Sequence, residues 1–220
     1  MISSIGKHIW EVCPHCKGES KKWLRGTCPV CFLNPKYYKG GSMTQIAWDC
    51  YFLRVAKMIS TNSKCLSRKI GAVLVRDNSI ISTGYNGPAR GVVHCNDRPI
   101  EFYEALDREL PKIRTMAEEG VCPRRYMGYG SGQGLHLCQA GHAERNALIQ
   151  AGRNGVSTKD TTLYLYCEKT SLPCKDCCIE IINAGVKEVI CLEGEYYDIY
   201  GKQLLEEAHI IIRKIDDKIL

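Results

Sequence analysis

The chain has 220 residues, a hydrophobic fraction of 45% and a formal net charge of +6 at pH 7, which suit one main domain with a sizeable core and a small appendage. Its apolar runs are too short to span a membrane, and the opening "MISSIGKHIW" lacks the charged start and apolar stretch of a signal peptide. We therefore expect a soluble protein of the cytoplasm, or of the host cytoplasm if the source is viral, with no membrane partner.

The cysteines indicate metal binding. Fourteen of them in a chain without an export signal favour zinc ligation over disulfides. The positive charge gathers in residues 1–43, which hold seven lysines and arginines against two glutamates. Ligating cysteines are thiolates and would offset this positive charge. The formal net charge is therefore weak evidence about the partners of the protein. Four cysteines in apolar stretches are read as buried hydrophobic residues: Cys50, Cys167, Cys178 and Cys191.

Two CxxC pairs near the N-terminus predict a structural zinc site. They are followed by a turn-rich stretch, "NPKYYKGGS". We expect residues 1–42 to form a small zinc ribbon with its linker, and residues 43–220 to form the main domain. The ribbon is basic and aromatic, which leaves nucleic-acid contact open, although a folding or oligomer-contact element is favoured. Its predicted ligands are Cys13, Cys16, Cys28 and Cys31.

The first half of the main domain reads as helix, hairpin and helix. Residues 45–60 have helical apolar spacing with Thr44 as the expected cap. Two β-rich runs, "GAVLV" and "SIISTGY", are separated by "RDN", which predicts a hairpin. Residues 99–120 read as a helix interrupted at Pro111.

After the glycine-rich loop at 128–134, helices and strands alternate. Helices are expected from His142 to about Gly152, from Cys174 to about Ala184, and near 202–208, separated by the strands "TLYLYC", "EVICL" and "IIIR". This alternation predicts an α/β sheet whose later strands are parallel. The carboxyl ends of those strands should carry the functional site.

Four residues at two of these helix starts suggest a zinc-activated water site. Cys174 and Cys177 lie on one face of a first helical turn, where unpaired N–H groups favour thiolates. His142 begins another helix and offers a nitrogen ligand. Three protein ligands leave a fourth position for water, as in catalytic zinc sites. Glu144, two residues on, can handle the proton of that water.

Each half of this pattern is weak alone. A His-x-Glu triplet is common, and an isolated CxxC is often a structural zinc pair or a redox motif. Together, His-x-Glu followed by Pro-Cys-x-x-Cys match the signature of zinc nucleobase deaminases, in which the glutamate is not a ligand. We therefore interpret the four residues as one site.

A series of motifs supports the same interpretation over residues 44–213. In order, the chain reads "KIGAVLV", "ISTGYNGPARG", "HCND", "CPRR", "LHLC", "HAERNAL" and "SLPCKDC". This series resembles the cytidine deaminase superfamily, and "GYNGPARG" resembles its deoxycytidylate (dCMP) deaminase branch, including phage and competence-operon members. The resemblance implies a three-layer α/β/α fold with a mixed five-stranded sheet, zinc ligands His142, Cys174 and Cys177, and Glu144 as proton shuttle.

The implied reaction is hydrolytic deamination of dCMP to dUMP and ammonia, which supplies thymidylate synthesis. Glu144 would take a proton from the zinc-activated water, whose oxygen attacks C4 of cytosine, and return protons to N3 and the leaving amine. The alternatives are a deaminase of dCTP or of modified dCMP, or of a base in single-stranded nucleic acid. A non-catalytic nucleotide sensor is disfavoured because Glu144 is present.

Several residues are candidates for substrate contact. By resemblance, Asn86 would reach the sugar, while Lys69, Arg68 and Arg90 are candidates for the phosphate, although each cation could also be a solvated surface charge. Arg145 departs from the acidic, amide or apolar residue of relatives, and either touches the nucleotide or faces solvent. The ribbon is a second departure from ordinary members.

We expect three zinc ions per chain. Besides the catalytic and ribbon ions, the resemblance implies a second structural zinc near the catalytic one, with His94 or His136 as a substitute for one sulfur. Its expected ligands are Cys65, Cys95, Cys122 and Cys138. The resemblance also implies a homo-oligomer, often a hexamer, controlled by dCTP and dTTP.

Overall fold

The computed structural model of the protein describes residues 38–39, 42–106, 122–130, 132–167, 172–196, 198–217 and 220. The predicted ribbon ligands Cys13, Cys16, Cys28 and Cys31, and the second half of the helix expected at 99–120, lie outside these residues. Residues Phe52–Leu220 form one compact unit, which contains the candidate site. The proposed boundary at residue 42 stays a prediction.

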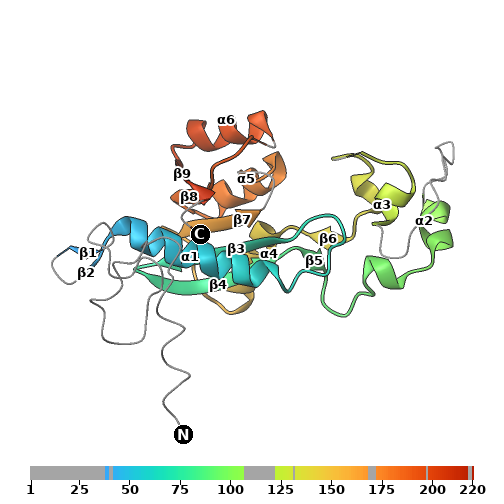
Figure 1. Ribbon diagram of the computed structural model, residues 1–220, viewed down its shortest axis with the longest axis horizontal. Coiled ribbons are helices and arrows are strands. Elements are labelled where there is room, and N and C mark those ends of the chain that lie inside the picture. The colour runs from blue at the N-terminus through green and yellow to red at the C-terminus, as the bar shows by residue number, and fades with distance from the viewer. Residues whose placement is uncertain are drawn as a thin grey trace, which may run out of the picture. The chain divides into compact units, whose positions relative to one another are not determined.

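A mixed five-stranded sheet organises this unit (Figure 1). The strand order is β4-β3-β7-β8-β9. The β3 strand pairs antiparallel with both β4 and β7, whereas β7, β8 and β9 are parallel, as predicted for the later strands. The strands are β3 (Ile70–Arg76), β4 (Ser79–Tyr85), β7 (Thr162–Cys167), β8 (Glu188–Leu192) and β9 (Ile211–Ile215).

Four helices agree with the sequence pattern to within a few residues, whereas the short helix at Pro123–Tyr126 was not predicted. The first begins directly after Thr44, and α2 lies at the start of the helix expected at 99–120, of which 107–120 are outside the described residues. The last begins three residues before the predicted start at 202. The α-helices are α1 (Gln45–Ser60), α2 (Ile100–Leu106), α3 (Pro123–Tyr126), α4 (Ala143–Arg153), α5 (Lys175–Asn183) and α6 (Ile199–Glu207), with short 3-10 turns at Cys95–Asp97 and Leu135–Leu137.

The predicted hairpin between β3 and β4 is confirmed. Its turn residues Asp77 and Asn78 have φ of 50° and 55°. Two consecutive positive φ values give a turn whose twist matches that of the flanking strands, and Asp and Asn tolerate this conformation best among non-glycine residues. The "RDN" segment thus sets the register of the hairpin.

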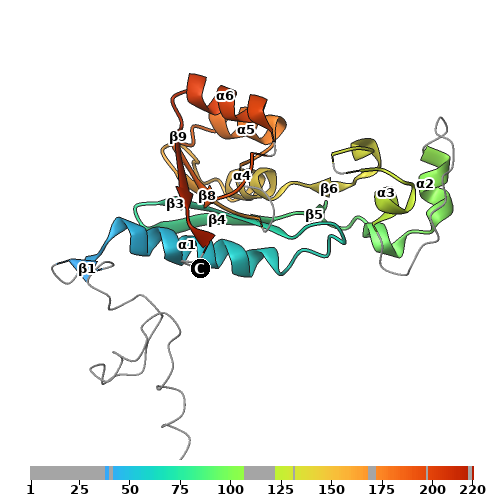
Figure 2. The same ribbon diagram turned by 45° about the horizontal axis from the view of Figure 1, so that its top comes forward.

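Helices cover both faces of the sheet, as the β7 strand shows. All six of its residues are buried, because successive side chains point to opposite faces and each face is packed. Leu163 and Leu165 join the core cluster under α4 and α5, while the ring of Tyr164 packs against Phe52 of α1 at 5.0 Å between centroids. The three-layer α/β/α arrangement is therefore confirmed (Figure 2).

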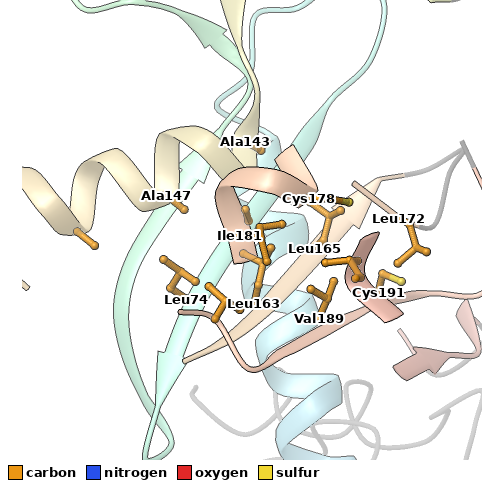
Figure 3. Packing of buried hydrophobic residues seen from close by; sticks show 14 residues of the cluster. Leu74, Ala143, Ala147, Leu163, Leu165, Leu172, Cys178, Ile181, Val189 and Cys191 are labelled. Carbon is orange, nitrogen blue, oxygen red and sulfur yellow. The ribbon is translucent and has the colours of Figure 1, made fainter. Parts of the chain in front are cut away.

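Small residues let α4 approach the sheet closely. Ala143, Ala147 and Ala151 recur at helical spacing on its buried face and belong to the same core as Leu163 and Ile181 (Figure 3). A side chain on Gly84 of β4 would lie 2.2 Å from the carbonyl oxygen of Ala143. The start of α4 is thus pressed directly onto the backbone of β4.

The cysteines expected in the core are buried. Cys50, Cys167, Cys178 and Cys191 are all buried and unbridged. Burial raises the pKa of both Cys178 and Cys191 to about 12, so these thiols stay neutral at pH 7. They act as small hydrophobic residues.

Two short ladders complete the described part of the chain. Strands β1 (Tyr38–Lys39) and β2 (Ser42–Met43) pair with each other, and β5 (Gly87–Pro88) pairs with β6 (Ala140–Gly141). The second ladder joins Gly87 to Gly141 and so brings Asn86 close to the start of α4. In the described ranges, no helix is long and apolar enough to cross a membrane.

Candidate active site

Two helix starts meet at the carboxyl end of the β7 strand. His142 is the N-cap of α4, with φ −72° and ψ 153°, and Cys174 is the N-cap of α5, with φ −70° and ψ 163°. Both residues have extended backbone, so their side chains leave the helix axis at the point where it begins. Cys177 follows in the first turn of α5. The predicted helix starts at His142 and Cys174 are confirmed.

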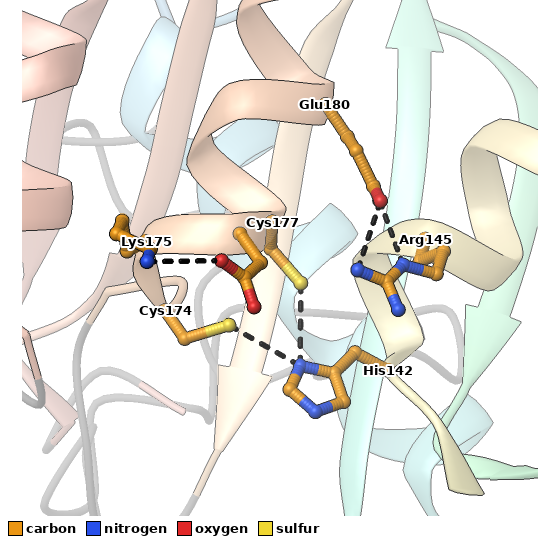
Figure 4. A network of polar contacts seen from close by, with 7 residues as sticks. His142, Arg145, Cys174, Lys175, Cys177 and Glu180 are labelled. Carbon is orange, nitrogen blue, oxygen red and sulfur yellow. Dashed lines mark hydrogen bonds and ion pairs between the residues drawn. The ribbon is translucent and has the colours of Figure 1, made fainter.

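The three side chains fit one zinc ion. The Nδ1 atom of His142 lies 3.4 Å from the sulfur of Cys174 and 3.3 Å from that of Cys177 (Figure 4). Ligands at about 2.0 and 2.3 Å from one ion in tetrahedral geometry would be roughly 3.5 Å apart. In the described ranges this is the one group of three or more candidate ligands whose atoms lie within 4.8 Å of one another.

The protonation of these groups suits a divalent cation. A hydrogen bond from the Cys177 thiol lowers the pKa of Cys174 to about 4. The same hydrogen bond, together with burial, raises the pKa of Cys177. The hydrogen bond with Cys174 also raises the pKa of His142. Metal binding would release the remaining protons from the two cysteines and the histidine.

Glu144 is placed to handle protons beside these ligands. It lies in the first turn of α4, its side chain is only 4% exposed, and its Oε2 atom is buried without a hydrogen-bond partner. Burial raises the pKa of its carboxyl group. A buried carboxylate oxygen without a partner is costly unless another molecule binds there. Oε2 of Glu144 is therefore a candidate contact for a bound molecule.

A cavity of about 460 Å³ opens over this group. That volume is within the range of small-molecule sites. Its wall combines the catalytic candidates with basic, acidic and apolar side chains, among them Arg68, Asn86, Arg124, Arg125, Glu144, Arg145, Leu165, Leu172, Lys175, Asp176 and Asp198.

The substrate candidates are placed differently from one another. Asn86 and Arg68 line the cavity. The amide of Asn86 accepts a hydrogen bond from the Ile70 N–H and donates one to the Arg68 carbonyl, both at 2.8 Å, so it braces the segment that carries Arg68. Lys69 is exposed, and the Arg90 guanidinium donates to Gln150 Oε1 at 2.5 Å. Neither Lys69 nor Arg90 lines the cavity.

Arg145 is at the cavity wall but already has a partner. Its guanidinium makes two contacts with the carboxylate of Glu180 on α5, at 2.9 and 2.8 Å. The guanidinium is therefore engaged with Glu180 in this structure, and a contact with the nucleotide stays a prediction. It connects the two helices that carry the candidate ligands.

Sequence reasoning did not single out Asp198, which caps two helices at once. Its Oδ2 accepts the N–H of Lys175 at 2.9 Å, and its Oδ1 accepts the N–H of Gly201 at 3.1 Å. These bonds lower the pKa of Asp198, the bond from Lys175 most of all. The cap of α6 has a sequence signal in an aspartate before a helix, but the cap of α5 has none.

The remaining polar-loop cysteines gather around a second, smaller cavity of about 30 Å³. Its wall includes Cys65, Cys95, Cys122 and Cys138, the four residues predicted to bind a structural zinc, together with His94. Their ligand atoms do not form a group within 4.8 Å in this structure. His136, the other substitute named above, does not line this cavity.

Comparison with known proteins identifies the family. The family model described as the cytidine and deoxycytidylate deaminase zinc-binding region matches residues 46–193, which include every residue of the candidate active site named so far except Asp198 and Gly201. The chain belongs to this family. A bound zinc is thus expected at His142, Cys174 and Cys177, whose donor atoms have the matching chemistry and spacing.

Relatives in yeast and phage are similar to most of the chain. The deoxycytidylate deaminase of Schizosaccharomyces pombe is 34% identical over 212 residues, covering 96% of this chain and 51% of that protein. That of Enterobacteria phage T4 is 34% identical over 154 residues, covering 64% of this chain and 75% of that protein. The chain spans about half the length of the two yeast relatives that it matches.

A solved structure supports the fold. The dCMP deaminase of cyanophage S-TIM5, in complex with dCMP and dUMP, superposes with a TM-score of 0.54 at 24% identity, covering 79% of this chain and all of the phage chain. The predicted cytidine-deaminase-like fold is therefore confirmed.

Proposed function

We propose that this protein hydrolyses dCMP to dUMP and ammonia, and so supplies the precursor of thymidylate. The observation that carries the proposal is the unpartnered Oε2 of Glu144 in the same cavity as the His142, Cys174 and Cys177 group. Membership of the deaminase family and the names of the yeast and phage relatives support the same reaction.

The residues of the chain divide the chemistry between binding and proton transfer. Zinc held by His142, Cys174 and Cys177 would supply a Lewis acid that lowers the pKa of a water molecule toward neutrality. Glu144 accepts a proton from this water while the oxygen of the water adds to C4 of the cytosine ring. Glu144 returns this proton to N3, then takes the second proton from the hydroxyl group now on C4 and passes it to the departing amine, so that one water is consumed and one ammonia is released.

The wall of the cavity excludes water and holds the substrate. Leu165 and Leu172 are buried there and offer apolar contact. Arg68, Arg124 and Arg125 add positive charge, which suits a nucleotide better than a nucleoside. Asn86, at the edge of the cavity, is a candidate for the sugar, although its amide already binds backbone groups.

A panel of substrates tests this function directly. Ammonia release by the purified protein is measured with dCMP, dCTP, deoxycytidine, 5-methyl-dCMP and single-stranded DNA. We expect the highest kcat/KM with dCMP. Faster turnover of dCTP or 5-methyl-dCMP would reassign the substrate within the same chemistry, and turnover of single-stranded DNA at least as fast as that of dCMP would overturn the proposal.

We further propose that the loaded protein contains three zinc ions. The gathering of Cys65, Cys95, Cys122 and Cys138 around one small cavity supports a structural ion there, since thiols in polar loops are otherwise hard to explain. The CxxC pairs of the ribbon support the third. Elemental analysis of wild type and Cys95→Ser tests the second site: we expect a loss of one zinc, and an unchanged value would remove it.

We also propose a cellular compartment and an oligomeric state for the enzyme. The ten described cysteines are all unbridged, which supports a reducing compartment such as the cytoplasm. The family resemblance supports a homo-oligomer controlled by dCTP and dTTP. Sedimentation of the protein with and without each triphosphate would test both expectations.

A further inference from the structure

The buried guanidinium of Arg124 has an unused donor. Arg124 lies in the short helix α3, and its side chain is only 9% exposed. Its Nη1 donates to the Gln133 carbonyl at 2.5 Å, but its Nε is buried without a hydrogen-bond partner. A buried cationic donor without an acceptor is strongly unfavourable. A ligand in the adjacent cavity would satisfy it.

Arg125 lines the same cavity beside it. Its side chain is half-buried, and its Nη1 donates to the Tyr129 carbonyl at 3.0 Å. Both arginines thus donate to neutral carbonyl groups, those of Gln133 and Tyr129. Within the part of the chain that the structure describes, no carboxylate forms an ion pair with Arg124 or Arg125, so their charges are not neutralised by these partners.

Four other charged groups in the cavity wall are already engaged. Arg145 forms its ion pair with Glu180, and Lys175 lies 3.5 Å from Asp176. The carboxylate of Asp198 accepts two backbone N–H groups. The wall around Arg124 and Arg125 therefore offers a concentrated positive charge to whatever enters.

We propose that Arg124 and Arg125 form the subsite that binds the 5′-phosphate of the nucleoside monophosphate, an inference that rests on the proposed deamination of dCMP. A guanidinium can present Nε and one Nη to two phosphate oxygens at once. A phosphomonoester carries nearly two negative charges at pH 7, which matches two arginines. These residues, from the "CPRR" motif, set the preference for nucleotide over nucleoside.

The thiols near Arg124 offer a competing explanation. Arg124 also borders the smaller cavity lined by Cys95 and Cys122, and thiolates there could balance its charge. That cavity of about 30 Å³ has room for one or two water-sized groups, not for a phosphate. If Arg124 served the thiols alone, its loss would change metal content or stability without changing the preference for a phosphorylated substrate.

The test compares substrates with and without the phosphate. The kcat/KM values for dCMP and deoxycytidine are measured for wild type, Arg124→Gln, Arg125→Gln and Arg124→Lys, each as the full chain with its zinc content determined. Binding of dUMP and deoxyuridine is measured by calorimetry as a readout independent of turnover. Arg153→Gln is the matched control, because Arg153 is exposed at the end of α4 and does not line the cavity.

We expect each glutamine variant to lower the dCMP-to-deoxycytidine ratio of kcat/KM by about 10- to 100-fold, the effect of losing a charge-assisted contact. Arg124→Lys keeps the positive charge but loses the planar guanidinium that can donate two parallel hydrogen bonds. Its ratio should therefore lie between those of wild type and Arg124→Gln. Arg153→Gln should change the ratio by less than about twofold. If Arg124→Gln does not fold, Arg125→Gln and Arg124→Lys decide.

The outcomes separate the subsite from the reaction. An unchanged ratio in folded Arg124 and Arg125 variants of an active enzyme would overturn the subsite and leave the proposed function intact. If wild type deaminates neither substrate but binds dUMP over deoxyuridine in a manner that depends on Arg124, the subsite stands and the proposed reaction fails.

Discussion

Arg145 and Glu180 join the two helices that carry the candidate zinc ligands. The guanidinium of Arg145 meets the carboxylate of Glu180 through Nε and Nη2 at 2.9 and 2.8 Å (Figure 4). One residue follows His142 by three positions on α4, and the other follows Cys177 by three on α5. The ion pair thus links α4 to α5 within one helical turn of a candidate ligand on each helix.

Removing this pair should affect stability slightly and substrate preference not at all. Both side chains are more than a third exposed, so solvent screening limits the pair to about 1 kcal/mol or less of unfolding free energy. Urea unfolding of Arg145→Ala, Glu180→Ala and the double variant measures the coupling. If Arg145→Ala alone lowered the dCMP-to-deoxycytidine ratio of kcat/KM by about tenfold or more, Arg145 would be a substrate contact. Losing a charge-assisted hydrogen bond to the substrate has roughly this effect.

Glu144→Gln should abolish turnover while keeping the metal. The amide cannot carry a proton between water and N3, and general acid-base catalysis contributes about 10²- to 10⁴-fold. Because Glu144 is not a ligand, zinc content should equal that of wild type. Steady-state kinetics and elemental analysis check both points. Full activity in the folded variant would refute the assigned role of Glu144.

Gly84→Ala should disrupt the site from a distance. The added methyl group would lie 2.2 Å from the Ala143 carbonyl oxygen and 2.4 Å from the Ala147 nitrogen, so α4 must move and carry His142 with it. We expect the free energy of unfolding to fall by roughly 1–3 kcal/mol or more. We also expect the variant to retain zinc less well.

Gly152→Ala is the matched control for that substitution. Gly152 lies in α4, and an added methyl group there would meet nothing within 4 Å. Because alanine is the better helix former, this variant should gain up to about 1 kcal/mol. Thermal unfolding and zinc release to a chelator measure both variants. Equal stability of the two variants would contradict the close packing of α4 on β4.

Asp198→Ala should destabilise the protein at neutral pH and less so in acid. Losing a cap costs about 1 kcal/mol, and Asp198 caps both α5 and α6. The folded-state pKa of Asp198 is lowered, so its contribution is complete above the unfolded pKa of about 3.9 and is lost as pH falls below it. Urea unfolding at pH 7 and pH 3.5 should show the difference between wild type and variant shrinking, whereas a constant difference would exclude the carboxylate charge as its source.

The local pattern of the sequence was sufficient for the strands of the main sheet and most of the helices, and it selected the candidate zinc ligands. The β-rich run "TLYLYC" and the turn residues in "RDN" indicate backbone geometry within a few positions, where steric and hydrogen-bonding preferences act. The spacing of Cys174 and Cys177, and of His142 and Glu144, is likewise local to a first helical turn. Such short-range constraints can be read from the order of residues alone.

Contacts between distant segments were decided only by the tertiary structure. Nothing in an arginine's neighbours shows that Arg145 reaches Glu180, or that Arg124 lines the cavity while Arg90 binds Gln150 outside it. The second cap made by Asp198 and the closeness of Gly84 to Ala143 also join separate segments. A long polar side chain has many low-energy rotamers, so its partner is set by how helices and strands pack, which no local pattern specifies.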